Sequence, residues 1–240
     1  MKEILIIGKK AILDAIKNKS LQRAIISNHD QNFYVTVKQF LGKKLIINND
    51  KNFYNKKISK FCNHQCAIGY IKNNLISNLN DLFANLKTKN ESTILFLDSI
   101  HDPYNFGSII RTAESFGIDA IIYRKDRQCQ ITPQVAKISS GAISNISLID
   151  VTNLVSTINK FKEIGYWVYA SCLDKAANNL TSIKFAKKTI LIIGNEDKGV
   201  SKLLLNNSDF KVKINIFGKT QSFNAAIATS IFLYAKSCQK

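Results

Sequence analysis

Proline and glycine are scarce in this sequence of 240 residues. It contains two prolines and ten glycines, which excludes a long flexible linker and a collagen-like segment. No apolar run approaches the roughly 18 to 20 residues that a membrane-spanning helix needs, so we expect no transmembrane segment. Hydrophobic residues still make up 45% of the chain, the ordinary share for a globular protein, and their burial can support folding.

The amino terminus and the cysteines favour a cytoplasmic protein. The apolar run at residues 4–7 is too short for a signal peptide, and no small-residue cleavage site follows it. The five cysteines are odd in number and scattered, which suits a reducing compartment.

Metal-binding patterns are also weak. Cys62 and Cys66 flank His64, but a structural zinc site needs four ligands, usually as two close pairs. The remaining cysteines are solitary: Cys129, Cys172 and Cys238. We therefore expect unliganded thiols and no metal, with a metal site as the weaker alternative.

Positive charge is abundant. The formal net charge is +17, from 34 Lys and Arg against 17 Asp and Glu. A domain that tolerates this much self-repulsion suggests a polyanionic partner such as a nucleic acid. The alternative is a lysine-rich proteome, and charge alone does not separate RNA from DNA or from an anionic membrane.

The length allows two small domains. In residues 1–75, short apolar runs predict strands at 4–7, 24–26, 45–47 and 67–71, and Ile12, Ala15 and Ile16 mark one face of a short helix. This region is a small α/β domain. Residues 76–92 are polar and Asn-rich around an apolar patch with helical spacing, and we expect the linker there.

Residues 93–240 alternate between strand and helix patterns. Strands are predicted at 93–98, 120–123, 147–151, 167–171, 189–194 and 211–216. Helices are predicted at 106–116, 133–139, 153–164, 201–206 and 222–237. Gly117 and Gly165 suit left-handed helix stops, and Thr132 and Thr152 suit helix starts. The alternation predicts an α/β fold with a mostly parallel sheet and helices on both faces, in which ligands bind beyond the carboxyl ends of the strands.

The loop after the first of these strands leads into a helix that carries Arg111. We place Arg111 about one turn inside that helix, with Asn105 in the preceding turn. An arginine there can grip a phosphate with its rigid fork of donors. The alternative is a solvated helix face with a weak ion pair.

Two further loops follow later strands. Residues 194–199 contain two glycines that permit close backbone approach to a ligand, while Glu196 would repel a phosphate, so the loop suits a cationic or neutral ligand. In residues 214–226, Gly218-Lys219-Thr220 is not a P-loop, because Lys213 stands where the first glycine is required. Ser222 suits a helix N-cap, with Asn224 in the first turn.

A basic cluster follows the predicted strand at 120–123. Arg124, Lys125 and Arg127 can contact RNA phosphates, and solvated surface charge is the equally weighted alternative. No Gly-x-Gly-x-x-Gly pattern occurs, so a dinucleotide-binding site is not indicated.

Taken together, the three loops resemble the motifs of the SpoU (TrmH) group of the SPOUT methyltransferases. Residues 105–113, 194–199 and 222–225 are similar to its first, second and third motifs in order and spacing. The resemblance covers residues 93–240. It implies S-adenosylmethionine as cofactor, transfer of its methyl group to a ribose 2′-hydroxyl of RNA, a trefoil-knotted domain, and a homodimer that shares its active site across the interface.

Within the group, the chain is most similar to the branch that methylates a guanosine of large-subunit ribosomal RNA. Residues 64–68 resemble the end of that branch's amino-terminal domain, which implies that residues 1–75 bind RNA. Two positions depart from the pattern. Asp197 stands where the second motif usually has glycine, and Asn215 where the third usually has proline.

The resemblance also implies roles for individual residues. Those expected to be catalytic are Arg111, Asn105, Glu196 and Asn224. Those expected to bind the cofactor are Gly194, Asn195, Gly199, Ile214, Ile216, Ser222 and Phe223. Proposals for the family make Arg111 the base, but a guanidinium keeps its proton, so an electrostatic clamp on the 2′-oxygen suits it better. The alternatives are a non-catalytic RNA-binding factor with this fold and a transfer-RNA methyltransferase.

Overall fold

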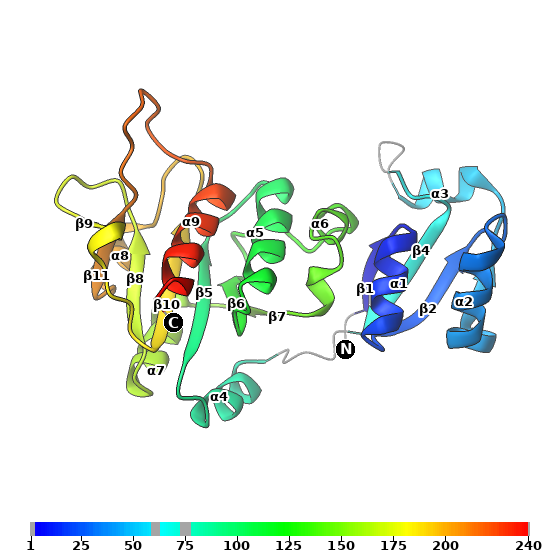
Figure 1. Ribbon diagram of the computed structural model, residues 1–240, viewed down its shortest axis with the longest axis horizontal. Coiled ribbons are helices and arrows are strands. Elements are labelled where there is room, and N and C mark those ends of the chain that lie inside the picture. The colour runs from blue at the N-terminus through cyan, green and yellow to red at the C-terminus, as the bar shows by residue number, and fades with distance from the viewer. Residues whose placement is uncertain (1–2, 59–62, 73–77, 240) are drawn as a thin grey trace. The chain divides into compact units, whose positions relative to one another are not determined.

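The computed structural model describes residues 3–58, 63–72 and 78–239, and the chain divides into two compact units (Figure 1). The first contains residues 1–75 and 130–145, and the second contains residues 76–129 and 146–240. Cys62 of the cysteine pair considered above lies outside the described residues. None of the helices in the described ranges is long and apolar enough to cross a membrane.

The first unit is a mixed α/β layer. Its strands are β1 (Glu3–Ile7), β2 (Leu21–Ile26), β3 (Leu45–Ile47) and β4 (Ala67–Lys72). Its helices are α1 (Lys9–Lys17), α2 (Gln31–Leu41), α3 (Lys51–Lys57) and α6 (Pro133–Ile138), with 3₁₀ turns η1 (Gly42–Lys44) and η2 (Ala142–Ser144). The sheet order is β1-β4-β2-β3, with β4 antiparallel to both neighbours and β2 parallel to β3.

All four strands predicted for this region are present, as is the helix at α1. The predicted ranges do not include α2 or α3, although both carry a helix signature. Asp30 caps α2 by accepting a hydrogen bond from the Phe33 amide, and Asp50 caps α3 through the Asn52 amide. Tyr54 of α3 is buried in an apolar cluster with the sheet residues Ile25 and Ile68.

The second unit holds a seven-stranded sheet. Its strands are β5 (Ser92–Asp98), β6 (Ala120–Arg124), β7 (Ser147–Val151), β8 (Trp167–Ser171), β9 (Asn178–Asn179), β10 (Lys188–Gly194) and β11 (Phe210–Lys213). Its helices are α4 (Leu79–Lys87), α5 (Pro103–Ser115), α7 (Leu154–Glu163), α8 (Lys202–Asn206) and α9 (Ala225–Ser237), with a 3₁₀ turn η3 (Leu180–Ser182).

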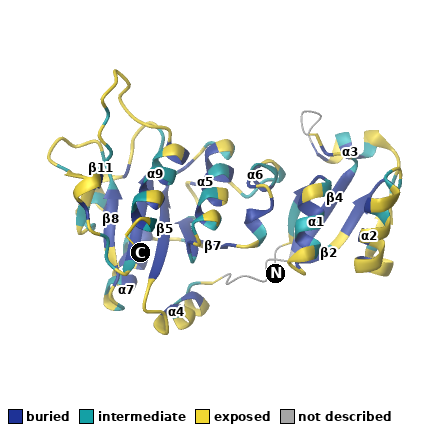
Figure 2. Ribbon diagram, in the orientation of Figure 1, coloured by how far each residue is buried: buried dark blue, intermediate teal, exposed yellow. Residues whose placement is uncertain are grey.

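Every strand pair in this sheet is parallel, in the order β7-β6-β5-β10-β8-β11-β9. Alternate strand residues on one face, such as Phe96 and Ile192, pack against Leu82 of α4, Phe161 of α7 and Leu204 of α8. On the other face α9 packs on β10 and beside α5, so helices cover both faces. Figure 2 shows the strands buried and the outer helix faces exposed. The predicted fold class is confirmed.

The segment expected to be a linker contains a packed helix. Leu82 and Leu86 of α4 are buried in the core of the second unit. Asn78 caps this helix by accepting from the Asp81 amide. The apolar patch therefore belongs to a core helix of the second unit.

Several element boundaries differ from the predicted ones. Helix α5 begins at Pro103 with Asp102 as N-cap, so Asn105 lies inside its first turn and Arg111 lies about two turns in. Helix α9 begins at Ala225 with Asn224 as N-cap, so the expectation of a Ser222 cap is wrong. Strand β11 ends at Lys213, three residues before the predicted end.

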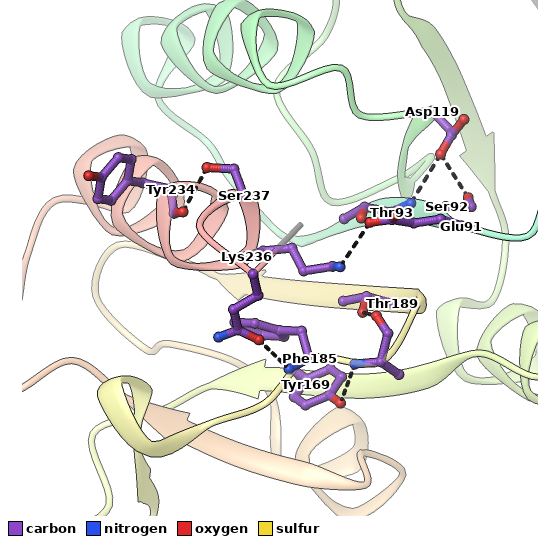
Figure 3. Close-up of polar contacts among 12 residues, drawn as sticks. Glu91, Ser92, Thr93, Asp119, Tyr169, Phe185, Thr189, Tyr234, Lys236 and Ser237 are labelled. Carbon is purple, nitrogen blue, oxygen red and sulfur yellow. Dashed lines mark hydrogen bonds and ion pairs between the residues drawn. The ribbon is translucent and has the colours of Figure 1, made fainter.

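The carboxyl end of α9 is fixed by polar contacts at the amino ends of the strands (Figure 3). The buried Lys236 ammonium lies 3.3 Å from a carboxylate oxygen of Glu91. Gln239 accepts from the Phe185 amide at 2.8 Å and donates to the Ile183 carbonyl at 2.8 Å. With this end held, the amino end of α9 is presented at the opposite edge of the sheet.

Candidate active site

Three side chains from distant parts of the chain meet beyond the carboxyl ends of the strands. Asn224 Nδ2 donates to Asn105 Oδ1 at 2.7 Å, and Asn105 Nδ2 donates to Glu196 Oε1 at 2.9 Å. Asn105 lies on α5, Glu196 follows β10, and Asn224 caps α9. The structure therefore brings together three of the four residues expected to be catalytic.

The direction of this hydrogen-bond chain is fixed by the cap of α9. Asn224 Oδ1 accepts from the amides of Ala226 (2.9 Å) and Ile227 (3.3 Å), so its Nδ2 must face Asn105. Asn105 then accepts with its oxygen and donates with its nitrogen. Glu196 receives the last donor, which suits an ionised carboxylate.

Asn195 organises the loop that carries Glu196. Its Nδ2 donates to the Ser99 carbonyl at 2.8 Å and to Glu196 Oε2 at 3.2 Å. Its Oδ1 accepts from the amides of Asp197 and Lys198, at 3.0 and 3.1 Å. Both oxygens of Glu196 are thus held by amide donors, one from α5 and one from its own loop.

Two glycines allow the same loop to close on itself. The amide and carbonyl of Asn195 pair with those of Gly199, whose φ is +66°. A Cβ on Gly194 would lie 2.1 Å from the backbone of Gly199 and Val200. Asp197 is not among the residues with positive φ, so its position does not need the conformational freedom of glycine.

A cavity of about 310 Å³ opens beside these loops. It lies beyond the carboxyl ends of β8, β10 and β11, the edge where parallel sheets bind ligands, and its volume suits a small organic molecule. All seven residues expected to bind the cofactor line it: Gly194, Asn195, Gly199, Ile214, Ile216, Ser222 and Phe223.

The charge of the cavity is opposite to that of the chain. Asp174, Glu196 and Asp197 line it with three carboxylates, against the single ammonium of Lys198, in a protein of net charge +17. The pKa of the Cys129 thiol is raised, chiefly by burial and then by the carboxylates of Asp102 and Glu196. The cavity therefore favours a ligand with positive charge.

One wall of this cavity was not predicted from the sequence. Ser171, Cys172, Leu173 and Asp174 follow β8 and line it. The signal was available, because this segment also follows a predicted strand of a parallel sheet. Asp98 was missed as well: its Oδ2 accepts from the Ser201 amide at 2.8 Å and ties the end of β5 to the segment before α8.

The remaining predicted residues lie outside the cavity lining. Arg111 is exposed on α5, about 9 Å along the helix axis from Asn105 at 1.5 Å per residue. Arg124, Lys125 and Arg127 lie at and after the end of β6, with Lys125 and Arg127 exposed. Across the described ranges, no group of His, Cys, Asp and Glu is arranged to hold a metal ion.

A parallel α/β sheet with an acid-lined cavity at its carboxyl edge, in a strongly basic chain, suits a protein that binds a small cationic ligand and a polyanionic partner. Residues 92–234 match the SpoU rRNA Methylase family. Since this match covers more than half of the chain, the protein belongs to that family of RNA methyltransferases.

Two curated relatives and one solved structure illustrate the similarity. An uncharacterized tRNA/rRNA methyltransferase of Mycoplasma genitalium is 40% identical over 187 residues, 77% of this chain and 76% of the relative. Its Mycoplasma pneumoniae homolog is 32% identical over 231 residues, 95% of this chain and 94% of the relative. The SpoU methyltransferase AviRb of Streptomyces viridochromogenes, solved in complex with the cofactor AdoMet, shares the fold with a TM-score of 0.82 and 18% identity, covering 99% of this chain and 90% of AviRb.

Proposed function

We propose that this protein transfers the methyl group of S-adenosylmethionine to the ribose 2′-hydroxyl of a guanosine in large-subunit ribosomal RNA, in the cytoplasm. The observation that carries the proposal is the acid-lined cavity beside the Asn224–Asn105–Glu196 chain. S-adenosylmethionine carries a sulfonium and an ammonium against one carboxylate, so its charge complements the cavity.

The residues present fit this cofactor. The loop backbone at Gly194 and Ile214 lies at the cavity, where it can hold the adenosine and methionine parts, and Phe223 offers an apolar surface. Glu196 and Asp197 supply negative charge for the cationic centre. When bound, S-adenosylmethionine supplies a methyl group made electrophilic by its sulfonium.

The residues of the hydrogen-bond chain position the reaction. In-line attack by a 2′-oxygen depends chiefly on orientation, which can contribute several kcal/mol. Asn105 and Asn224 fix the Glu196 carboxylate and with it the wall of the cavity. Because a guanidinium group is a poor base, we assign Arg111 the role of a clamp on the 2′-oxygen and the adjacent phosphate, with the proton of the 2′-hydroxyl passing to a phosphate or to water.

We also propose a homodimer through α9 that shares its active site between protomers. This helix is apolar on nearly all sides, and a helix of that kind is normally buried. Ile227 and Tyr234, seven residues apart, are 52% and 63% exposed. Arg111 lies on the exposed face of α5, which packs beside α9, so docking at this surface would bring Arg111 close to a second protomer.

The first unit is proposed to bind RNA, together with Arg124, Lys125 and Arg127, and this favours ribosomal RNA as substrate. Transfer-RNA methyltransferases of the group typically lack such a domain. Transfer RNA is nevertheless the second candidate substrate, because both Mycoplasma relatives are described as tRNA/rRNA methyltransferases.

Calorimetric titration with S-adenosylmethionine, followed by transfer of a labelled methyl group to ribosomal RNA, tests the proposal. We expect the wild type to bind and transfer, and Arg111→Ala to bind with nearly unchanged affinity but to transfer almost nothing. A wild-type protein that binds RNA without binding the cofactor would instead be a non-catalytic factor with this fold. Turnover by Arg111→Ala would remove Arg111 from its assigned role.

A further inference from the structure

An exposed arm projects from the lining of the cofactor cavity. The two ends of the arm line the cavity: Ile214 and Ile216 at one end, Gln221 and Ser222 at the other. The tip, residues 217–220, is exposed along its whole length. Figures 1 and 2 show this arm, between β11 and α9, extending away from the body of the unit. The tip therefore lies beside the cavity but outside it.

The tip carries the most exposed of the large hydrophobic side chains described. Phe217 is 96% exposed, whereas Phe223, next to one end of the arm, is 40% exposed. A single exposed apolar residue is ordinary on a protein surface. Phe217 differs in its place, because it directly follows Ile216, which lines the cavity, although Phe217 itself is not part of the lining.

The charge of the arm is opposite to that of the cavity. From Lys213 to Asn224 the charged residues are Lys213 and Lys219, with no carboxylate. Lys213 donates to the Lys175 carbonyl at 2.6 Å at the base of the arm, and Lys219, two residues after Phe217, is exposed at the tip. The carboxylates thus lie within the cavity and the ammonium groups along the arm.

We propose that the arm tip binds the RNA strand next to the methylated nucleotide, with a nucleobase stacked on Phe217 and a phosphate beside Lys219. An exposed aromatic ring next to a cation matches the sites that bind single-stranded RNA, because every base has a face that can stack. This inference rests on the proposed function, since it assumes that the strand is delivered to the cofactor cavity. A second protein copy is a poorer occupant, because like lysines would meet across the contact.

The test measures binding of fluorescein-labelled rA12 and rU12 to the full chain, with heparin as a polyanion that has no bases. We expect Phe217→Ala to weaken rA12 binding by at least about five-fold and rU12 binding by less, and Phe217→Trp to restore it, because stacking carries that share of the affinity. Heparin binding should be unchanged. Lys219→Ala should weaken all three ligands and lower the salt dependence of RNA binding by about 0.7 in log–log slope.

Trp167→Ala is the matched control, because Trp167 is half exposed at the other end of the sheet, at the start of β8. Trp167→Ala should bind rA12 within about two-fold of the wild-type affinity, since we expect no base to stack on Trp167. Unchanged rA12 binding by Phe217→Ala would overturn the proposal, as would wild-type protein that fails to bind rA12. If Phe217→Ala lost cofactor affinity, the arm would be a cofactor lid, and if it lost the dimer, the arm would be a subunit contact. Either result would also overturn the proposal that the arm binds RNA. Failure of the proposed function is separate, because it appears as a wild type that does not bind S-adenosylmethionine.

Discussion

Asn224 has two tasks that a pair of substitutions can separate. Its oxygen caps α9, and its nitrogen donates to Asn105. Asn224→Ala removes both and should lower the free energy of unfolding by about 1 kcal/mol, as loss of an N-cap does. Asn224→Asp keeps the cap but has no donor for Asn105, so the chain to Glu196 is broken.

We therefore expect Asn224→Asp to unfold in urea near the wild-type midpoint while losing most of its methyl transfer. Asn224→Ala should lose both stability and activity. Wild-type activity in Asn224→Asp would show that the hydrogen-bond chain does not position the reaction.

His64 makes the stability of the first unit depend on pH. Its Nδ1 accepts from the Cys66 amide at 2.9 Å, its Nε2 lies 3.0 Å from Asn55 Oδ1, and its ring stacks on Tyr54. Burial first, and then the ammonium groups of Lys51 and Lys137, hold its pKa below the ordinary value of 6.5. Folding therefore favours the neutral form of His64.

The unfolded chain protonates His64 at a higher pH than the folded protein does. The contribution of His64 to the free energy of unfolding is therefore complete above pH 6.5 and is lost as the pH falls toward the lowered pKa. Chemical denaturation at pH 7.5 and 5.5 should show a smaller loss of stability in His64→Gln than in the wild type. His29→Gln, at an exposed position, should keep the full loss. The same pH dependence in His64→Gln would contradict this account.

Individual side chains were predicted by their type and position, but not by their contacts. Asn105, Glu196 and Asn224 could be selected as site residues because each stands in a segment that follows a predicted strand, in the order of the family motifs. Their mutual hydrogen bonds depend on how the first turn of α5, the loop after β10 and the cap of α9 meet in space, which no local pattern contains. Ser222 was assigned the cap of α9 because serine suits caps, and Asn224, two residues later, takes that place.

In the loop after β10, the backbone of Gly199 and Val200 passes very close to Gly194. A methyl group on Gly194 would collide with the backbone of Gly199 and Val200, and that backbone cannot move without breaking its pairing with Asn195. Gly194→Ala should therefore lower the free energy of unfolding by about 1 to 3 kcal/mol, the usual cost of overpacking. Cofactor affinity should fall with it, because the same loop lines the cavity.

Gly218→Ala is the matched control for thermal unfolding and cofactor calorimetry. A Cβ at Gly218 would meet nothing within 4 Å, and its φ is not positive. We expect this variant to match the wild type in both measurements. A Gly194→Ala protein with wild-type melting temperature and affinity would rule out the close approach as a constraint.

Hydrophobic periodicity predicted where the helices and strands lie, but not the residues at which they begin and end. Helix α5 begins at Asp102-Pro103, a cap followed by proline at the first helical position, which is a local signal that the predicted start at residue 106 passed over. Strand β11 ends at Lys213 although the apolar alternation continues through Ile214 and Ile216, because the backbone pairs with its neighbours only as far as Lys213 and the following segment lines the cavity.

For the whole molecule, the exposed face of α9 predicts the oligomeric state. Ile227→Asp combined with Tyr234→Asp should convert a dimer to a monomer, because two charges from each protomer would be buried in an apolar contact. Light scattering after gel filtration measures this directly. Leu203→Asp, at a 64% exposed position on α8, should remain dimeric. A monomeric wild type would refute the proposed interface.

The relation between distant parts of the chain was the least predictable property. Residues 130–145 group with the first unit although they stand between β6 and β7 of the second, and periodicity within a short window contains no such information. The trefoil knot stays a prediction of the family resemblance for the same reason. The mostly parallel sheet was predictable, because alternating strands and helices favour that arrangement.

Ribose methylation mapped across ribosomal and transfer RNA would show whether this protein methylates a large-subunit guanosine. The cells compared would carry the wild-type gene, no gene, or a gene encoding Arg111→Ala. We expect one guanosine of large-subunit ribosomal RNA to be methylated only with the wild type, with transfer RNA unchanged. Ribosomal RNA that is methylated identically in all three would contradict this expectation.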